Sequence, residues 1–286
     1  MQGKNLQKTL LILLLISVIV GCSSVKLGYR FMDNAIRWKI NDYVSLNAQQ
    51  SRTVTQGIND FHRWHQATQL SLYANFMQKA AKRFEQTSLS TSELSQLYDE
   101  AFALALTSVD ELMPVISDML LSLSPEQILL TLKKIEIESA KEMKKDFGIT
   151  PAQRLVKRQN KMIKRVVKWT GPLNKSQLGI IADWAKAMPV DESLRVARQD
   201  KFVSMLSTQL KDRSNPEQFK QALSAQIKTP ERFSSAQYKQ SYAKRKLLML
   251  SLMSDLFGSL TARQKTQLIN STKKYQSDFL YLAPRS

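Results

Sequence analysis

One short pattern recurs along this chain and limits most strongly what the chain can fold into. An aliphatic residue precedes Ser, Thr or Asn, and a Gln follows that polar residue by three positions. This is the sequence of a capping box: the polar side chain accepts from the N–H of the third helical residue, and the Gln side chain accepts from the N–H of the polar residue. Each occurrence predicts the start of a helix. The five occurrences are Leu46–Gln50, Leu123–Gln127, Ile149–Gln153, Leu173–Gln177 and Leu260–Gln264, and two variants are Leu89–Glu93 and Asn215–Gln218.

Composition agrees with a helical fold. Gly and Pro number 8 each among 286 residues, too few for the many turns of an all-β protein. Apolar residues recur three or four positions apart over long stretches, as they do on one face of a helix. The predicted fold class is therefore all-α, an irregular array or bundle of about ten helices, with Pro114 expected to kink or divide the third. The predicted helices span 28–43, 47–86, 90–122, 125–146, 151–169, 174–187, 191–212, 216–226, 231–257 and 261–281.

The N-terminal segment predicts a lipoprotein signal peptide. Lys4 and Lys8 precede the apolar run Leu10–Val20, which is too short to span a bilayer because spanning needs ~20 residues. The run ends in Ile-Val-Gly followed by Cys22, which has the form of a bacterial lipobox whose cysteine accepts a thioether-linked diacylglycerol. An ordinary secretory signal with a chance cysteine is the alternative. Ser23 follows the cysteine, and resemblance to Gram-negative lipoprotein sorting favours the outer membrane over the inner one.

Cleavage before Cys22 gives the predicted domain organisation. Residues 1–21 form the signal peptide, 22–26 a short lipidated tether and 27–286 a helical periplasmic domain, with a possible internal boundary near 169–174. The loss of Lys4 and Lys8 lowers the formal charge from +18 to +16. Basic proteins often bind nucleic acid, but we do not expect nucleic acid as a partner of a protein that is exported to the periplasm. The expected partner is the membrane, through the lipid anchor, and the sequence leaves the oligomeric state open.

The candidate binding site is a strongly basic helix face. Its members recur at steps of three, one, three, three, one and three, so they share one side of a helix, and no acid lies between them. This face predicts an anionic partner, either an envelope protein or anionic lipid. Alternatively, the face is only solvated, or it pairs with acids of a neighbouring helix such as Asp99–Glu100 or Asp110–Glu111. The seven residues are Arg154, Lys157, Arg158, Lys161, Lys164, Arg165 and Lys168.

Catalysis, metals and cofactors find little support. The single cysteine excludes a multi-cysteine metal site, and His62 with His65 supplies only two of the ligands that zinc needs. A glycosidase needs two carboxyl groups that act together on one bond. Adjacent residues on a helix point ~100° apart, so none of the following pairs forms such a dyad by itself: Asp99–Glu100, Asp110–Glu111 and Asp191–Glu192. We therefore expect no enzyme, no metal and no cofactor. A peptidoglycan hydrolase stays the third hypothesis for function.

Two resemblances bear on function. Trp38, Asp42-Tyr43, Trp64-His65, Tyr73 and Trp169-x-Gly-Pro-Leu, together with the lipobox, resemble an uncharacterised family of Gram-negative lipoproteins with a domain of unknown function. Gln66 stands where that family often has Arg. This resemblance implies a helical, lipid-anchored envelope protein and no activity. The recurring helix starts resemble the Leu-Thr-x-x-Gln repeats of Spy and CpxP, which are small cationic periplasmic chaperones.

From these observations the chain is expected to be a non-catalytic binding or scaffold protein of the cell envelope, anchored in the outer membrane and facing the periplasm. The alternative is a Spy-like chaperone that works without ATP.

Overall fold

The prediction of an all-α fold is confirmed. The computed structural model describes residues 24–284, and within them it contains eleven α-helices, one 3₁₀ helix and no strand. The helices are α2 (Ser24–Arg30), α3 (Met32–Asn41), α4 (Ala48–Arg83), α5 (Thr91–Leu121), α6 (Pro125–Phe147), α7 (Pro151–Thr170), α8 (Lys175–Ala187), α9 (Glu192–Lys211), α10 (Pro216–Lys228), η1 (Pro230–Phe233), α11 (Ala236–Gly258) and α12 (Ala262–Leu282).

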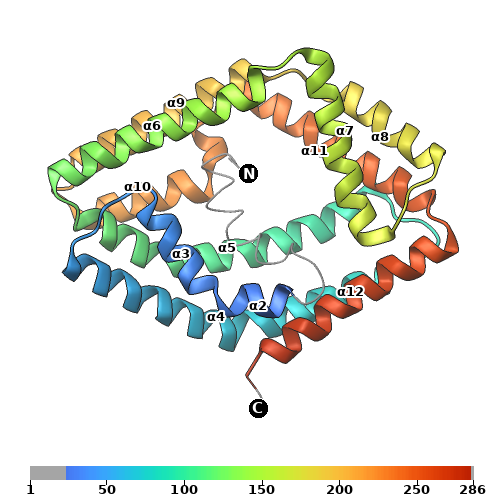
Figure 1. Ribbon diagram of the computed structural model, residues 1–286, viewed down its shortest axis with the longest axis horizontal. Coiled ribbons are helices and arrows are strands. Elements are labelled where there is room, and N and C mark those ends of the chain that lie inside the picture. Colours follow the sequence, from blue (N-terminus) through green and yellow to red (C-terminus); the bar gives the residue numbers. More distant parts are fainter. Residues whose placement is uncertain (1–23, 285–286) are drawn as a thin grey trace.

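The helices are arranged as a ring (Figure 1). α4 packs against α5 and α12, α12 against α7, α7 against α8, α8 against α11, and α11 against α5, which closes the circuit. α6, α9 and α10 form a second wall that joins α5 through α10. The last helix of the chain therefore lies beside the first long one. Side chains also tie the two together, since Gln66 Nε2 donates to the carbonyl of Leu282 at 2.8 Å.

Three apolar clusters hold the ring together. One joins α5, α6, α9 and α10 around Val109, Leu210 and Leu223. A second joins α2, α3, α4 and α12 around Tyr29 and Phe279. The third joins α7, α8 and α11 and contains, among others, Met162, Ile181, Trp184 and Leu252. Because each cluster lies between neighbouring helices, burial is distributed around the ring, as in other helical arrays.

The helix starts predicted from the capping-box pattern and its variants are confirmed. Both hydrogen bonds of a capping box are present at the starts of α4, α5, α6, α7, α8 and α12. Asn215 caps α10 with the weaker arrangement, in which its side chain accepts from the N–H of Gln218 at 3.1 Å. Ser235 caps α11 in the same way, which the sequence pattern did not indicate.

Two of the predicted helix boundaries are wrong, and one of the two alternatives for Pro114 is excluded. The expected single helix 28–43 is two helices, because the chain breaks at Phe31, and the first of them begins at Ser24. Pro114 lies inside α5 and does not divide it. The expected start of a helix at 231 falls in the 3₁₀ turn η1, and α11 begins only at Ala236.

The signal peptide and the lipidation site Cys22 lie outside the described residues. Among residues 24–284, no helix combines the length and the apolar character needed to cross a bilayer.

Candidate functional site

The seven basic residues lie on α7, as the sequence predicts. Thr150 caps this helix and Pro151 occupies its first position, where the missing N–H costs nothing. The opposite side of α7 is apolar, and Met162 and Ile163 belong to the cluster shared with α8 and α11. Packing of that side fixes the rotation of α7, so the basic side turns away from the core.

Two members of the basic face hold α7 to its neighbours. Arg154 Nε lies 3.3 Å from a carboxylate oxygen of Glu192, at the start of α9. Arg158 Nη1 donates to the carbonyl of Ala185 on α8 at 2.7 Å. Burial of this guanidinium lowers the pKa of Arg158. Arg154 and Arg158 therefore have a structural role at the edge of the face.

The acids that the sequence suggested as partners are engaged elsewhere. Asp99 accepts from Lys246 at 2.9 Å, and Asp110 pairs with Lys228. Glu100 pairs with Lys79. Asp99, Glu100 and Asp110 therefore do not neutralise the basic face, but Glu192 on the neighbouring helix α9 is an acid that does reach it.

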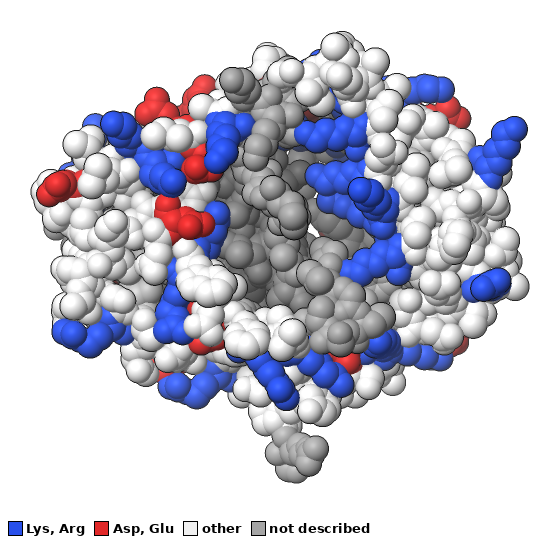
Figure 2. Space-filling model, in the orientation of Figure 1, with Lys and Arg blue, Asp and Glu red and all other residues white. Residues whose placement is uncertain are grey.

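The middle of the basic face is open to solvent. Lys157, Lys161, Lys164 and Arg165 are exposed. In the space-filling view the molecule is hollowed at its centre, and Lys and Arg side chains border the hollow where Figure 1 places α7 (Figure 2). The basic side of α7 thus borders a concave part of the surface.

At its C-terminal end the basic face runs into a cavity of about 590 Å³ between α2, α7 and α12. The buried ammonium of Lys168 lies in its wall, and α12 contributes Arg263 and Lys274. The ring of Trp169 stacks on that of Tyr275 with centroids 5.0 Å apart. The complete lining is Val25, Lys168, Trp169, Arg263, Thr266, Gln267, Asn270, Ser271, Lys274, Tyr275 and Asp278.

Cations dominate the charge of this cavity. Its one acid, Asp278, is buried and is paired with Lys26 of α2 at 3.3 Å. Lys168, Arg263 and Lys274 therefore outnumber the acid in the lining, and amide and hydroxyl groups surround them. Such a mixture of cations and hydrogen-bond donors suits carboxylate or phosphate oxygens.

The capping-box glutamines have a second role that the sequence pattern did not reveal. Gln50 and Gln127 donate to each other's side-chain oxygens at 3.0 and 2.9 Å, and Gln177 and Gln264 do the same at 2.8 and 2.9 Å. Each amide also donates to a backbone carbonyl just before the partner's helix, for example Gln264 to Pro172 at 2.7 Å. Two helix starts are thereby joined face to face at each of two corners of the ring.

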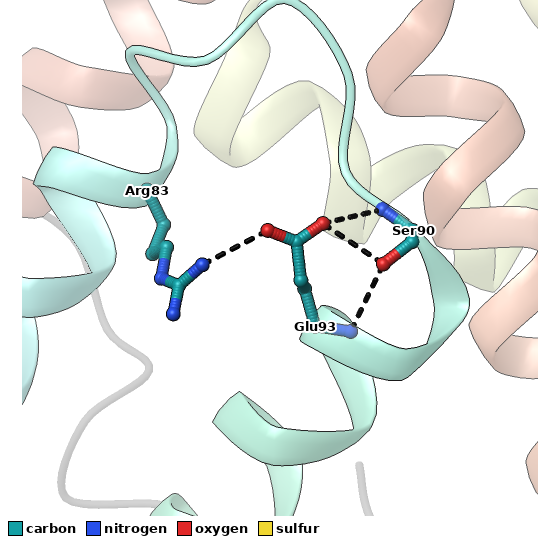
Figure 3. A network of polar contacts seen from close by, with 3 residues as sticks. All are labelled: Arg83, Ser90 and Glu93. Atoms are coloured by element: carbon teal, nitrogen blue, oxygen red, sulfur yellow. Dashed lines mark hydrogen bonds and ion pairs between the residues drawn. The ribbon is translucent and has the colours of Figure 1, made fainter.

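The chemistry of the amide explains why these positions hold Gln. A Glu could accept the capping bond equally well, but only the amide also has N–H groups to donate to the partner. Glu93 illustrates the difference (Figure 3). One oxygen of its carboxylate accepts from the N–H and the hydroxyl of Ser90 at 3.0 and 2.8 Å, and the other oxygen accepts from Arg83 at 2.9 Å. Where the partner is a cation, the capping box has the acid.

His65 lies in a buried chain of polar groups. Its Nδ1 is 3.1 Å from the hydroxyl of Tyr29, its Nε2 is 3.2 Å from that of Tyr73, and Tyr73 is 2.8 Å from the hydroxyl of Ser108. The imidazole is 2 % exposed, and burial lowers the pKa of His65 to about 4, with a smaller contribution from His62. The neutral ring is therefore a structural link between α2, α4 and α5.

The remaining candidate residues are also accounted for by packing. Among the side chains that the structure describes, no three of His, Cys, Asp or Glu come close enough to hold a metal ion. Asp191 is buried and accepts from Arg245 at 2.9 Å and Ser241 at 2.7 Å, whereas Glu192 turns to Arg154. These neighbouring acids point to different partners, as adjacent residues at a helix start do.

The fold and the site define an all-helical protein whose most distinctive surface is a cationic helix face bordering a central hollow. The chain belongs to the family described as "Family of unknown function (DUF6279)", which matches residues 42–239. That match includes α4 to α10, and with them the whole basic face. No curated protein and no solved structure matches the chain. The resemblance to an uncharacterised family is confirmed to this extent.

Proposed function

We propose that this protein is a lipoprotein of the outer membrane that faces the periplasm and binds an acidic protein partner, without catalysing a reaction. The observation that carries the proposal is the continuity of the basic face on α7 with the cationic cavity at its end. Exposed Lys157, Lys161 and Lys164 lead to the buried ammonium of Lys168, beside Arg263 and Lys274.

The shape of this surface favours a polypeptide segment over a bilayer. A lipid surface is broad and nearly flat, so it cannot follow cations along a hollow and into a cavity of about 590 Å³. An extended acidic segment of an envelope protein can do so, with side chains reaching Lys168 while its backbone lies along α7. Charge complementarity of this kind speeds association and selects the partner.

The envelope location rests on the sequence. The basic start, the short apolar run and Gly21-Cys22 support lipidation, and Ser23 supports the outer membrane. With Cys22→Ala we expect loss of fatty-acid labelling in cells and release of the protein from membranes by alkaline washing. Ser23→Ala is the matched control and should behave as wild type. A Cys22→Ala protein that stays membrane-bound after the wash would show that the anchor is wrong.

The partner can be captured by a photo-crosslinking residue at Lys161 in living cells. We expect a few discrete protein adducts. Reversal of charge in Lys157→Glu/Lys161→Glu/Lys164→Glu should lower the affinity for the captured protein at least ~10-fold, since 1.4 kcal/mol corresponds to tenfold and three contacts are reversed. These three residues are chosen because Arg158 bonds to α8, so reversing it would disturb the fold.

A matched control separates position from total charge. Lys201, Lys211 and Lys239 are also exposed, and their reversal to Glu changes the net charge equally. That variant should keep the adducts and the affinity. A broad smear of periplasmic proteins at Lys161 would instead support the Spy-like alternative. Adducts to lipid alone, or equal losses in both triple variants, would contradict a specific acidic partner.

A further inference from the structure

The helix pair α2–α3 has two apolar stripes. The inner stripe, Val25, Tyr29 and Met32, is buried in the cluster with α4 and α12. Leu27 on α2, Phe31 between the two helices and Trp38 on α3 are exposed and form a second stripe, which is not part of that cluster. Only one of them is needed to attach α2–α3 to the ring.

The second stripe is open. Leu27 is 58 %, Phe31 55 % and Trp38 73 % exposed, whereas the other three Trp residues of the chain are at least half covered or buried. Tyr281, near the end of α12, is 56 % exposed, and its ring lies 3.9 Å from the ammonium of Lys26. The apolar stripe therefore extends toward the adjoining end of α12. Exposed apolar residues gathered in this way mark a surface that a membrane or another molecule covers.

Cations flank this stripe. The segment from Ser24 to Asn41 holds four Lys or Arg and one Asp, a net charge of +3. Arg30 is exposed beside Phe31, and Lys26 and Lys39 are partly exposed. Apolar and aromatic side chains between cations are typical of helices that lie in the interface of an anionic bilayer, and Trp in particular favours that depth.

The position of the stripe in the chain identifies what covers it. α2 begins at Ser24, two residues after Cys22, and two residues reach at most ~7 Å. If Cys22 is lipidated, as proposed above, this short distance places the start of α2 within the headgroup layer of the membrane. The exposed apolar side chains of a helix held at this depth can contact the lipid directly.

We infer that α2–α3 lies in the membrane interface, with Leu27, Phe31 and Trp38 inserted among the lipids of a bilayer containing anionic phospholipid. This contact fixes the orientation of the ring relative to the membrane. The membrane is then contacted by a surface other than the basic face on α7.

The test uses the full chain and its single cysteine. Acylation blocks the thiol of Cys22, so a cysteine introduced elsewhere is the one site for a thiol-reactive fluorophore. Phe31→Cys and Trp38→Cys report on the stripe. Leu247→Cys is the matched control, because Leu247 is 67 % exposed on α11, which packs against α5, α8 and α9. Membrane retention alone cannot report on the stripe, since acyl chains would hold the protein regardless.

The labelled proteins are mixed with vesicles of phosphatidylethanolamine and phosphatidylglycerol that carry brominated acyl chains, which quench only fluorophores at or below the headgroups. We expect the emission at 31 and 38 to fall to about half, as for side chains ~5–10 Å deep in the interface, and the emission at 247 to stay unchanged. Unquenched probes at 31 and 38, or equal quenching at all three positions, would overturn the inference.

Mass spectrometry of the same samples, together with labelling of the wild-type chain, reports acylation of Cys22 separately. Acylated protein with unquenched probes contradicts the interfacial stripe and leaves the anchor intact. Unacylated protein contradicts the anchor, and because all three variants then also carry the fluorophore on Cys22, stronger quenching of the 31 and 38 variants than of the 247 variant supports the stripe. Failure of both readouts contradicts both.

Discussion

Gln177→Glu is expected to destabilise the protein by about 4 kcal/mol. This is the typical cost of leaving an uncompensated charge buried, as when one partner of a buried ion pair is removed. Gln177 is 0 % exposed and donates to the carbonyl of Ser259 at 2.9 Å and to Gln264 at 2.8 Å. A carboxylate would keep the capping bond of α8, but it would face these two acceptor oxygens with no proton to offer. The measurement is the free energy of unfolding in urea at neutral pH.

Gln153→Glu is the matched control for that experiment. Gln153 caps α7 through the same bond to Thr150 at 2.9 Å, but it is exposed. Its replacement should change stability by no more than ~0.5 kcal/mol, because an acid in the first turn is favourable to the helix dipole. The penalty at Gln177→Glu should also shrink at pH 4, because burial raises the pKa of the new carboxyl and its protonated form can donate. Equal costs in the two variants would mean that the Gln pairs contribute only their caps.

Acid is expected to weaken the fold through His65. The folded pKa of about 4 is below the unfolded value of 6.5, so the unfolded state binds more protons between these two values. Stability contributed by the neutral ring is complete above pH 6.5 and is lost as the pH falls toward 4. At 1.36 kcal/mol per pH unit, the loss between pH 6.5 and pH 5 is about 2 kcal/mol.

The comparison of wild type with His65→Gln isolates this contribution from that of the carboxylates. Gln can still bond to the hydroxyls of Tyr29 and Tyr73, and it does not titrate. Its unfolding free energy should therefore fall less than that of wild type between pH 6.5 and pH 5. His62→Gln is the control for the loss of a histidine that is only partly buried. Burial lowers the pKa of His62 too. Parallel pH curves for wild type and His65→Gln would show that His65 does not govern acid sensitivity.

The sequence predicts the helices of this protein well because their starts are local features. A capping box depends on residues three apart, so the pattern at Asn174 and Gln177 is sufficient to place the start of α8. The pairing of Gln177 with Gln264 depends on which two helix starts meet, and these residues are 87 positions apart. Local periodicity carries no information on that distance. The ring closure was unpredictable for the same reason.

The candidate site shows the same division. The helical period correctly gathers the seven cations on one side of α7, but it does not separate Arg158, which is bonded to α8, from exposed Lys164. Likewise, no local pattern distinguishes Trp38, which is exposed, from Trp64, which packs on the core cluster of α2, α4 and α12. Only the neighbours in space decide which side of a doubly apolar helix is covered.

The closure of the ring by its last helix has a consequence for how the protein is made. α12 packs against both α4 and α7 and covers the apolar side of α4, and the bond between Gln66 and Leu282 joins residues 216 positions apart. Contacts across such a separation form slowly, because much of the chain must be ordered before they can be made. During synthesis, α4 emerges early, and its apolar side stays uncovered until the end of the chain has been made. A chain that stops before α12 therefore exposes the apolar side of α4, and quality-control proteases should remove it quickly.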